Sequence, residues 1–238
     1  MTRQTSKGTC TFCHRELSKA SMTRHLASCE QRIAMQGEIG SRQKAKKIKA
    51  FHLVVEGYRL PMYWMHLDVS VDTTLATLDR FLRVTWLECC GHLSVFRISG
   101  FNYYVDAEID AYWDWDIRRK NMQAKLGEVL SPGQTCSYEY DFGSTTELLV
   151  KVIAEHEVDM KGKAIQVLAR NTLPHISCNV CGKPATIFCT QCVYEDEGCL
   201  CDACAKDHKC SEEMLLPLVN SPRAGICGYT GQDPAHIW

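Results

Sequence analysis

Residues 178–210 contain the side chains best suited to chemistry, a dense set of potential metal ligands. Three Cys-x-x-Cys pairs and a histidine follow one another with the spacing C-x2-C-x7-C-x2-C-x8-C-x2-C-x3-H. Each pair can direct two thiolates at one ion, and a tetrahedral zinc site takes two such pairs, or one pair with a histidine and a further cysteine. The pattern predicts these ligands: Cys178, Cys181, Cys189, Cys192, Cys201, Cys204 and His208.

The 15 cysteines of this 238-residue chain could alternatively pair as disulfides. However, the first residues show no apolar run typical of a secretory signal, and no apolar stretch approaches the roughly 20 residues that span a bilayer. We therefore expect a cytoplasmic protein without membrane association, in a compartment that keeps thiols reduced. Reduced thiols favour metal ligation over disulfides.

A second group of potential ligands lies near the N-terminus. Its members have the spacing C-x2-C-x11-H-x3-C: Cys10, Cys13, His25 and Cys29. A tight turn would supply the two leading cysteines, and a helix capped by Ser18 or Ser21 would carry His25 and Cys29 on one face. About 30 residues cannot bury enough apolar surface by themselves, so metal binding would fold this segment.

Charge is distributed unevenly along the chain. The first 50 residues carry eleven Lys or Arg against three Glu, a net charge of +8, whereas the remainder carries −9. A basic arm of this kind is typical of contact with nucleic acid or another anionic surface, and a solvated surface is the alternative. Side chains that could contact phosphates lie in the N-terminal finger and in a polar segment over 36–50: Arg24, Arg42, Lys44, Lys46, Lys47 and Lys49.

Residues 51–170 have the patterning of a folded α+β body. Alternating apolar residues over 63–71 predict a strand, and an apolar face over 75–82 predicts a helix capped by Asp72 or Thr73. Further strands are predicted at 94–98, 138–142 and 147–153, the last two as a hairpin. The acidic stretch 106–120 indicates a surface loop. We expect a mixed sheet with the helix packed on one face.

The same central residues resemble the plasmid pRiA-type ORF-3-like family, also labelled insertion-sequence passenger TnpR-like. The resemblance rests on the helix start Thr73–Leu78, on Trp86, His92 and Phe96, and on Tyr138–Gly143. It implies an α+β fold, a prokaryotic source and a link with plasmids or mobile elements, but no molecular function. The family commonly shows an acid, a Trp and a His after the last of these motifs. Ser-Thr-Thr-Glu-Leu follows here instead, so any site built on that Trp or His is absent.

The two cysteine-rich ends resemble known zinc modules. The N-terminal spacing is similar to the ββα finger of the two-Cys, two-His type, with Cys29 as fourth ligand in a CCHC set. The C-terminal spacing is similar to interleaved two-zinc modules of the B-box and MYND kind, in which alternate pairs share an ion. That resemblance implies two ligand sets: Cys178, Cys181, Cys201 and Cys204 for one zinc, and Cys189, Cys192, His208 and Cys210 for the other.

Several alternatives remain open for the C-terminal ligands. Cys199 and His175 compete with Cys210 for the eighth position. A consecutive arrangement would instead place the first two Cys-x-x-Cys pairs around one ion. Cys227 falls outside these spacings and is not expected to be a ligand.

The predicted organisation is a CCHC finger (1–35), a basic linker (36–50), an ORF-3-like domain (51–170) and a Cys-rich zinc module (171–238), with about three Zn²⁺ ions. Closed tetrahedral sites are structural, because catalytic zinc keeps an open position for water. We therefore expect a non-catalytic adaptor or regulator that contacts DNA, RNA or a protein. The alternative is an enzyme of unknown reaction that uses Cys89, Cys90 and His92, a possible thiolate–imidazole combination.

Overall fold

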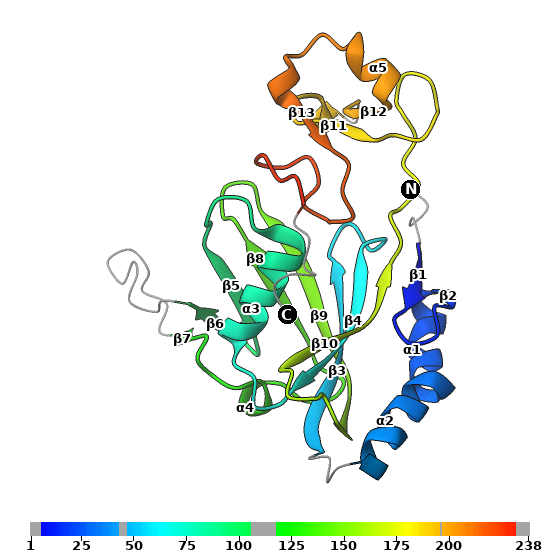
Figure 1. The fold of residues 1–238 in the computed structure, drawn as a ribbon. Coiled ribbons are helices and arrows are strands. Elements are labelled where there is room, and N and C mark those ends of the chain that lie inside the picture. The colour runs from blue at the N-terminus through cyan, green and yellow to red at the C-terminus, as the bar shows by residue number, and fades with distance from the viewer. Residues whose placement is uncertain (1–5, 43–46, 106–117, 196, 232–238) are drawn as a thin grey trace.

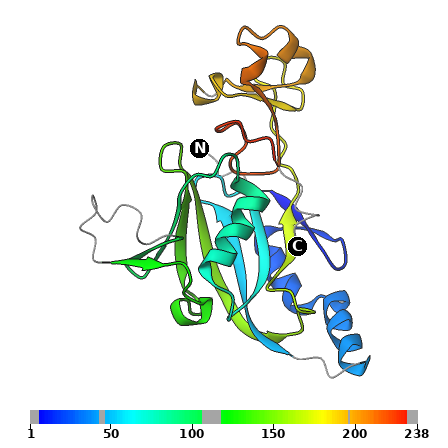
Figure 2. The same cartoon turned by 60° about the vertical axis from the view of Figure 1, so that its left-hand side comes forward.

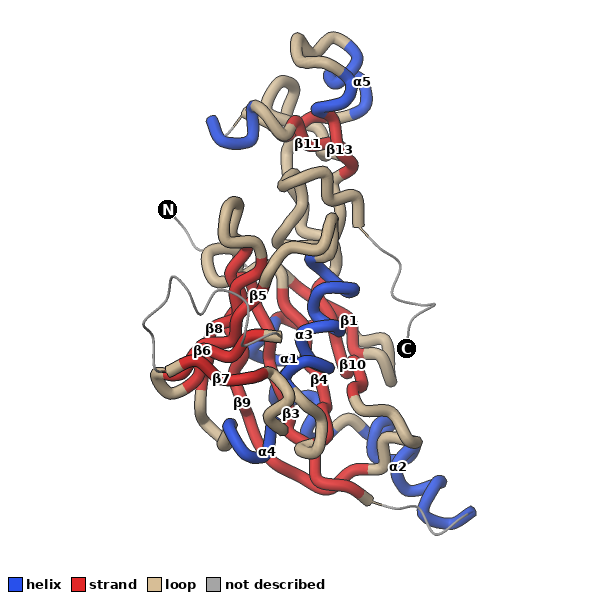
Figure 3. Tube along the Cα trace, turned by 90° about the vertical axis from the view of Figure 1, so that its left-hand side faces the viewer, coloured by secondary structure: helices blue, strands red, loops and turns tan. Residues whose placement is uncertain are grey.

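The computed structural model describes residues 6–42, 47–105, 118–195 and 197–231. The strands of the body are β1 (Lys7–Cys10), β2 (Glu16–Ser18), β3 (Ile48–Gly57), β4 (Trp64–Ser70), β5 (Ser94–Ile98), β6 (Phe101–Tyr104), β7 (Arg119–Asn121), β8 (Thr135–Tyr140), β9 (Thr146–Val158) and β10 (Ile165–Asn171). Within the described residues they form one ten-stranded sheet in the order β2-β1-β10-β4-β3-β9-β8-β5-β6-β7 (Figure 1). Its pairs are antiparallel except β6 with β7, so the sheet is mixed, and strands dominate the body (Figure 3).

Helix α3 (Leu75–Leu82) covers one face of this sheet, as its apolar pattern predicts (Figure 2). Leu75, Leu78 and Leu82 are completely buried in the main core, which the central strands and Trp86 complete. The cap is Thr74 rather than the predicted Asp72 or Thr73, because the chain stays extended through Thr74. The Thr74 hydroxyl accepts a hydrogen bond from the Thr77 N–H at 3.2 Å.

Most of the predicted strands are confirmed, but two central ones lack a prediction. The segment 94–98 coincides with β5, the hairpin lies in β8 and β9, and 63–71 contains β4. Nothing in the pattern marks β3, although it pairs with both β4 and β9. Strand β3 is buried on both faces over most of its length, and its buried stretch is apolar apart from His52, so it shows no alternation of apolar and polar residues. Strand β10 is likewise not predicted from the sequence.

The N-terminal ββα unit continues the sheet instead of flanking it as a separate finger. Strand β1 pairs antiparallel with β10, and helix α1 (Lys19–Ser28) packs onto the same region. The buried Met22 and Leu26 of α1 share a core cluster with Trp64 and Leu168 of the sheet. The finger and the body therefore have a common hydrophobic core across the predicted boundary at residue 35.

A close approach between β1 and β10 depends on Gly8. A Cβ atom at this position would lie 2.4 Å from the Arg170 carbonyl oxygen and 2.5 Å from the Trp64 ring. Such distances are far below ordinary contact, so a larger residue would force the strands apart.

The predicted basic linker is partly regular structure. Helix α2 (Glu30–Arg42) begins directly after α1 and occupies the first part of 36–50, and β3 begins at Ile48. Residues 43–46 lie outside the described part of the chain. Most of the predicted acidic loop, residues 106–117, also lies outside it.

The C-terminal Cys-rich segment forms a small unit of its own, beyond one end of the body (Figures 1 and 2). It contains β11 (Ile187–Cys189), β12 (Cys199–Leu200), α5 (Asp202–Lys206) and β13 (Leu215–Pro217). The strands pair in the order β12-β11-β13. Residues 218–231 then run back and pack against the body beside α3.

Candidate metal centres

Four groups of Cys and His side chains have their potential ligand atoms within 4.8 Å of one another. Each group contains four residues, the number that a closed tetrahedral site needs. The groups are Cys10, Cys13, His25, Cys29; Cys178, Cys181, Cys201, Cys204; Cys189, Cys192, His208, Cys210; and Cys89, Cys90, His92, Cys227. The described part of the chain can therefore hold metal ions at four places.

Distances between the ligand atoms fit a four-coordinate ion. With Zn–S bonds of about 2.3 Å and Zn–N bonds of about 2.0–2.1 Å, a regular tetrahedron places two sulfurs about 3.8 Å apart, and a sulfur and a nitrogen about 3.6 Å apart. The Sγ–Sγ distances are 4.0 Å for Cys10–Cys29, 3.6 Å for Cys181–Cys201 and 3.6 Å for Cys192–Cys210. A disulfide needs sulfurs about 2.05 Å apart, so these thiols are free.

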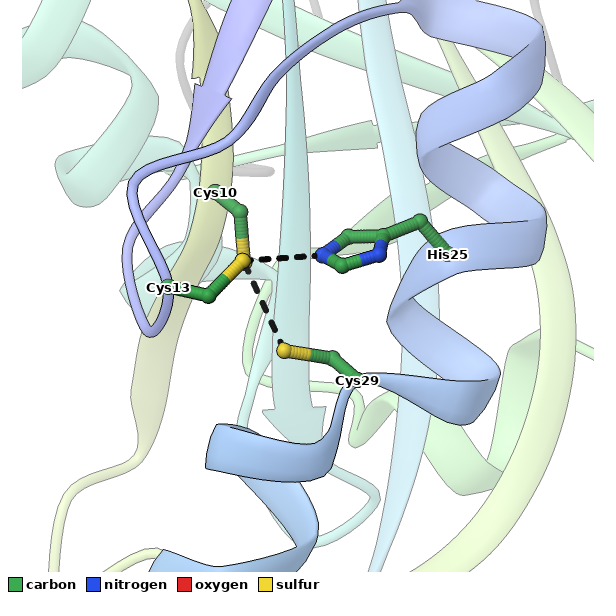
Figure 4. Close-up of side chains that lie close together, drawn as sticks. All are labelled: Cys10, Cys13, His25 and Cys29. Atoms are coloured by element: carbon green, nitrogen blue, oxygen red, sulfur yellow. Dashed lines mark hydrogen bonds between the residues drawn. The ribbon is translucent and has the colours of Figure 1, made fainter.

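In the N-terminal group, the ββα fold positions the ligands (Figure 4). Cys10 ends β1, and the following turn is closed by the His14 N–H donating to the Cys10 carbonyl at 3.0 Å. This turn brings the Cys13 Sγ to 3.2 Å from the His25 Nε2. His25 lies in the last turn of α1, and Cys29 terminates that helix as its C-cap.

Helix α1 is held in place by the cap at its start. Of the two predicted caps, the structure uses Ser18, whose Oγ accepts from the Ser21 N–H at 3.4 Å.

Burial is uneven within the N-terminal group: Cys10 and Cys29 are buried, whereas Cys13 and His25 are half-buried.

The second group combines the first and third Cys-x-x-Cys pairs. A turn at Cys178 is closed by the Gly182 N–H donating to the Cys178 carbonyl, and Gly182 has a φ of +73° that favours glycine. Cys201 is the N-cap of α5, and Cys204 lies within that helix. The structure therefore gathers Cys178 and Cys181 with this pair, not with the second pair as the consecutive alternative requires.

The third group combines the second pair with His208 and Cys210. Cys189 ends β11, and the Cys192 Sγ lies 3.5 Å from the His208 Nε2. Cys210 takes the place for which Cys199 and His175 were competitors. Cys199 instead lies in β12 and packs in the small cluster around Phe188 and Leu218.

Electrostatics in the C-terminal unit favour a bound cation. Burial opposes ionisation of Cys178, but backbone N–H groups of Cys181, Cys201 and Val180 donate to its sulfur and lower its pKa to about 6. For Cys204, the crowding of neighbouring thiols raises the pKa to about 12, led by hydrogen bonds with Cys181 and Cys201. Four sulfurs this close cannot all be thiolates without a positive ion between them.

The same contrast occurs in the third group. Backbone donors from Cys192 and Gln191 overcome burial and lower the pKa of Cys189 to about 7. The pKa of Cys192 is raised to about 12, first through its hydrogen bonds with Cys210 and Cys189. In each of these two groups the backbone thus favours the thiolate form of one cysteine, Cys178 or Cys189, whereas neighbouring thiols oppose it at another, Cys204 or Cys192.

The fourth group brings in a residue that the spacing excluded. Cys227 lies 3.3 Å through its Sγ from the Nε2 of His92, although 135 residues separate the two in sequence. No pattern in the sequence could have paired them, because the contact is made by the chain folding back after the Cys-rich unit.

The residues predicted to contact nucleic acid are partly within the described chain. Arg24 is exposed on α1, and Lys47 and Lys49 are exposed near the start of β3, where Lys49 forms an ion pair with Glu155 at 3.1 Å. Arg42 ends α2, but its side chain, together with Lys44 and Lys46, lies outside the described residues.

Helix α1 does not project freely from the body. Its first turns border a groove of about 580 Å³ whose other wall is formed by β3, β9 and the Trp64 ring. Lys19 forms an ion pair with Glu56 across this groove. The first turn of α1 therefore lines a groove against the sheet, which hinders its insertion into a DNA groove.

A buried ionic cluster lies where the finger meets the sheet. Asp68 is completely buried on β4 and pairs with Arg32 of α2 at 2.7 Å and with His156 at 3.1 Å. Burial opposes ionisation of Asp68, but its hydrogen bond to His156 and the charge of Arg32 lower its pKa. Beside it, His52 and His66 share a hydrogen bond of 2.9 Å.

The alternation of β4 contained a signal for this cluster. Met65, Leu67 and Val69 face the main core, while His66 and Asp68 face the opposite side of the sheet. If only the core face were covered, these two polar residues would be exposed to solvent. All residues of β4 are buried, so this polar face is covered, and the finger covers it.

Among the described residues, no helix combines the length and the apolar character needed to cross a bilayer.

Comparison with known proteins addresses the central body. A sequence model described as plasmid pRiA4b ORF-3-like protein matches residues 49–179, more than half of the chain. The chain belongs to this family. The match extends from β3 to the first Cys-x-x-Cys pair, and it leaves the N-terminal finger and most of the C-terminal unit outside.

No curated protein matches the chain. Among solved structures, a protein of unknown function from Methanosarcina mazei Go1 is similar, with 18% sequence identity and a TM-score of 0.44. The similarity covers 54% of this chain and 72% of that one.

Proposed function

We propose that this ORF-3-like protein is a non-catalytic binding protein whose finger and C-terminal unit are held by structural Zn²⁺ ions. The observation that carries the proposal concerns the three groups near the chain ends, which we call the terminal groups: the N-terminal group and the second and third groups. Each of them supplies four protein ligands at tetrahedral spacing. Thiolate-rich sets of this kind select zinc among the common divalent ions. A site filled by four protein ligands leaves no position for a reacting water, so the ions would stabilise and not catalyse.

The partner that the charge distribution supports is nucleic acid, contacted through its phosphates. Residues 1–50 carry a net charge of +8, and Arg24, Lys47 and Lys49 are exposed. Because the first turns of α1 face the sheet, we propose contact without reading of base sequence. A link with mobile elements, which the family resemblance implies, would be compatible with such a role.

Binding of the full-length, zinc-loaded protein to random-sequence DNA and RNA over a salt series tests this role. A phosphate-driven interaction should weaken steeply as salt rises, with a slope that reflects the number of phosphates contacted. The variant Arg24→Ala/Lys47→Ala should lower the affinity for nucleic acid and reduce the salt slope. The control Lys161→Ala removes a lysine from a turn outside the basic first 50 residues and should change neither. Absence of binding at low salt contradicts the nucleic-acid role and makes a protein the partner to seek.

The enzyme alternative is favoured by one distance, 3.0 Å between the Cys90 Sγ and the His92 Nε2, which is within hydrogen-bond reach. A cysteine nucleophile needs only such a base and an orienting group, whereas here two further cysteines crowd the same atoms. The arrangement supports ligation better than nucleophilic attack.

A further inference from the structure

The group around His92 joins two parts of the chain that are distant in sequence. Cys89, Cys90 and His92 follow the helical turn Arg83–Leu87 at the end of α3. Cys227 lies in the segment 218–231, which returns to the body after the Cys-rich unit (Figure 1). The potential ligand atoms of all four residues are within 4.8 Å of one another.

The spacing of these atoms is that of a metal site. The Sγ of Cys90 lies 3.8 Å from the Sγ of Cys89 and 3.8 Å from the Sγ of Cys227. This equals the edge of about 3.8 Å expected between two sulfurs on a tetrahedral zinc. The His92 Nε2 completes the set at 3.0 Å from Cys90 and 3.3 Å from Cys227, which is closer than the sulfur–nitrogen edge of about 3.6 Å, so a bound ion would move these atoms slightly apart. A disulfide would require sulfurs about 2.05 Å apart.

The backbone on both sides of the group adopts left-handed conformations. Gly91 has a φ of +83°, and a Cβ there would meet no atom within 4 Å, so the backbone angle and not the space requires glycine. Cys227 has a φ of +49° and Gly228 a φ of +67°. Such a conformation is unfavourable for a non-glycine residue, and at Cys227 it aims the thiol at the other three ligands.

The segment that carries Cys227 is fixed to the body by contacts of its own. Arg223 is completely buried and donates from Nη2 to the Asp141 carboxylate at 2.7 Å and to the Cys89 sulfur at 3.4 Å. Ser221 donates to the Trp86 carbonyl at 2.5 Å. These contacts position Cys227 without any ion, so its approach to His92 is built into the fold.

A buried cation lies beside the group. Three thiolates, one neutral imidazole and one Zn²⁺ would carry a net charge of −1, and the Arg223 guanidinium lies between the Cys89 sulfur and the Asp141 carboxylate and attracts both. The Asp141 carboxylate, 3.5 Å from the His92 Nε2, is held by the same guanidinium.

We propose a fourth Zn²⁺ site that fastens the segment 218–231 to the central domain, with the ligands Cys89, Cys90, His92 and Cys227. On binding, the three thiols release their protons to solvent and the ion takes their place. The site closes a loop that contains the whole Cys-rich unit, so it ties that unit to the body at both ends. It goes beyond the proposed function, which needs only the three terminal ions.

This site is more open than the other three. Cys90 and Cys227 are both exposed, whereas each of the terminal groups contains at least one buried cysteine. Water and chelators therefore reach the fourth ion most easily, and it should be the first to leave.

Zinc content of the reduced, full-length protein, measured by elemental mass spectrometry, tests the proposal. We expect four ions per chain in the wild type and three in Cys227→Ser. The control Cys136→Ala removes a buried cysteine that belongs to none of the four groups, and it should retain four ions. Equal zinc content in the wild type and Cys227→Ser overturns the fourth site while leaving the proposed function intact.

A second variant separates loss of a ligand from loss of folding. Cys227→His restores a ligand and should return the content to four ions, and its Co²⁺ form should show weaker thiolate-to-metal absorption than the wild type, by the share of one thiolate. Hydrogen exchange over 218–231 should be slow in the wild type and Cys227→His, and faster in Cys227→Ser. A Cys90–Cys227 cross-link found in place of the ion, released by reductant in peptide mapping, also overturns the proposal.

Discussion

The finger and the C-terminal unit both gather four-ligand groups, but different interactions hold those ligands in place. In the finger, Cys10 and Cys29 are buried in a cluster with Trp64 and Leu168 of the sheet, and β1 is hydrogen-bonded to β10. In the C-terminal unit, the strands are two or three residues long, and the apolar clusters are small, one around Phe188 and Leu218 and the other around Cys189 and Leu200. A bound metal ion would therefore add to an existing core in the finger and would take the place of a large core in the C-terminal unit.

Metal removal should expose this contrast most strongly. With a chelator, residues 176–217 should lose their hydrogen-exchange protection completely, because structural zinc contributes roughly 10–16 kcal/mol to domains of this kind. β1 and α1 should keep part of their protection through the shared core. Hydrogen exchange followed by mass spectrometry measures both segments in one experiment.

Single-ligand variants provide the matched controls for that experiment. Cys178→Ser should unfold only the C-terminal unit, and Cys13→Ser should weaken the finger without unfolding it. Equal loss of protection in the two regions would show that the shared core does not support the finger.

The buried Asp68–Arg32 pair should have the next largest effect. Asp68→Ala leaves the Arg32 guanidinium buried without its partner, so we expect a loss of about 3–5 kcal/mol in the free energy of unfolding. Because α2 carries Arg32, the loss should appear as release of the finger from the sheet. Denaturant unfolding with exchange mapping measures it.

The double variant Asp68→Ala/Arg32→Met is the control for that prediction. It removes both charges and should recover much of the lost stability. If the double variant is no more stable than Asp68→Ala, the unpaired charge is not the cause.

Acid should weaken the same interface through two histidines. Burial lowers the pKa of His52 to about 4 and that of His66 to about 3, against 6.5 in the unfolded chain. Below pH 6.5 these two imidazoles bind protons in the unfolded state but stay neutral in the folded state. The free energy of unfolding should therefore fall as the pH drops from 6.5 towards 4. The expected loss is on the order of a few kcal/mol.

Urea unfolding at a series of pH values checks this slope. Metal loss at low pH affects every variant, so the comparison is with His52→Asn/His66→Asn, whose stability should depend less on pH over the same range. Equal slopes in the two proteins would contradict the role of the histidine pair.

The smallest expected effect concerns the cap of α1. Ser18→Ala removes the side-chain acceptor for the Ser21 N–H and should cost about 1 kcal/mol. Ser28→Ala, at an exposed position without a cap role, should change stability much less. Calorimetry of the zinc-loaded protein measures the melting temperature of both variants. Because the finger shares the core of the body, the lower melting temperature of Ser18→Ala should appear in the main unfolding transition.

Much of the local structure could be predicted from the sequence. The hairpin of β8 and β9, strand β5 and helix α3 follow from periodicity, because each has one face in the core and one elsewhere. Strand β3 could not be predicted in this way, since burial on both faces removes the alternation. The alternation of β4 marks His66 and Asp68 as a polar face, but it does not show that this face is buried, because the burial depends on the finger that covers it.

For the candidate metal groups, the sequence by itself determined the tight Cys-x-x-Cys turns, because ligands two or three residues apart are brought together by local backbone geometry alone. Only the tertiary structure decided which pairs meet, that the finger shares the sheet's core, and that Cys227 reaches His92 across 135 residues. Contacts of that length depend on where the chain returns, and that is set by the packing of Arg223 and Ser221 against the body.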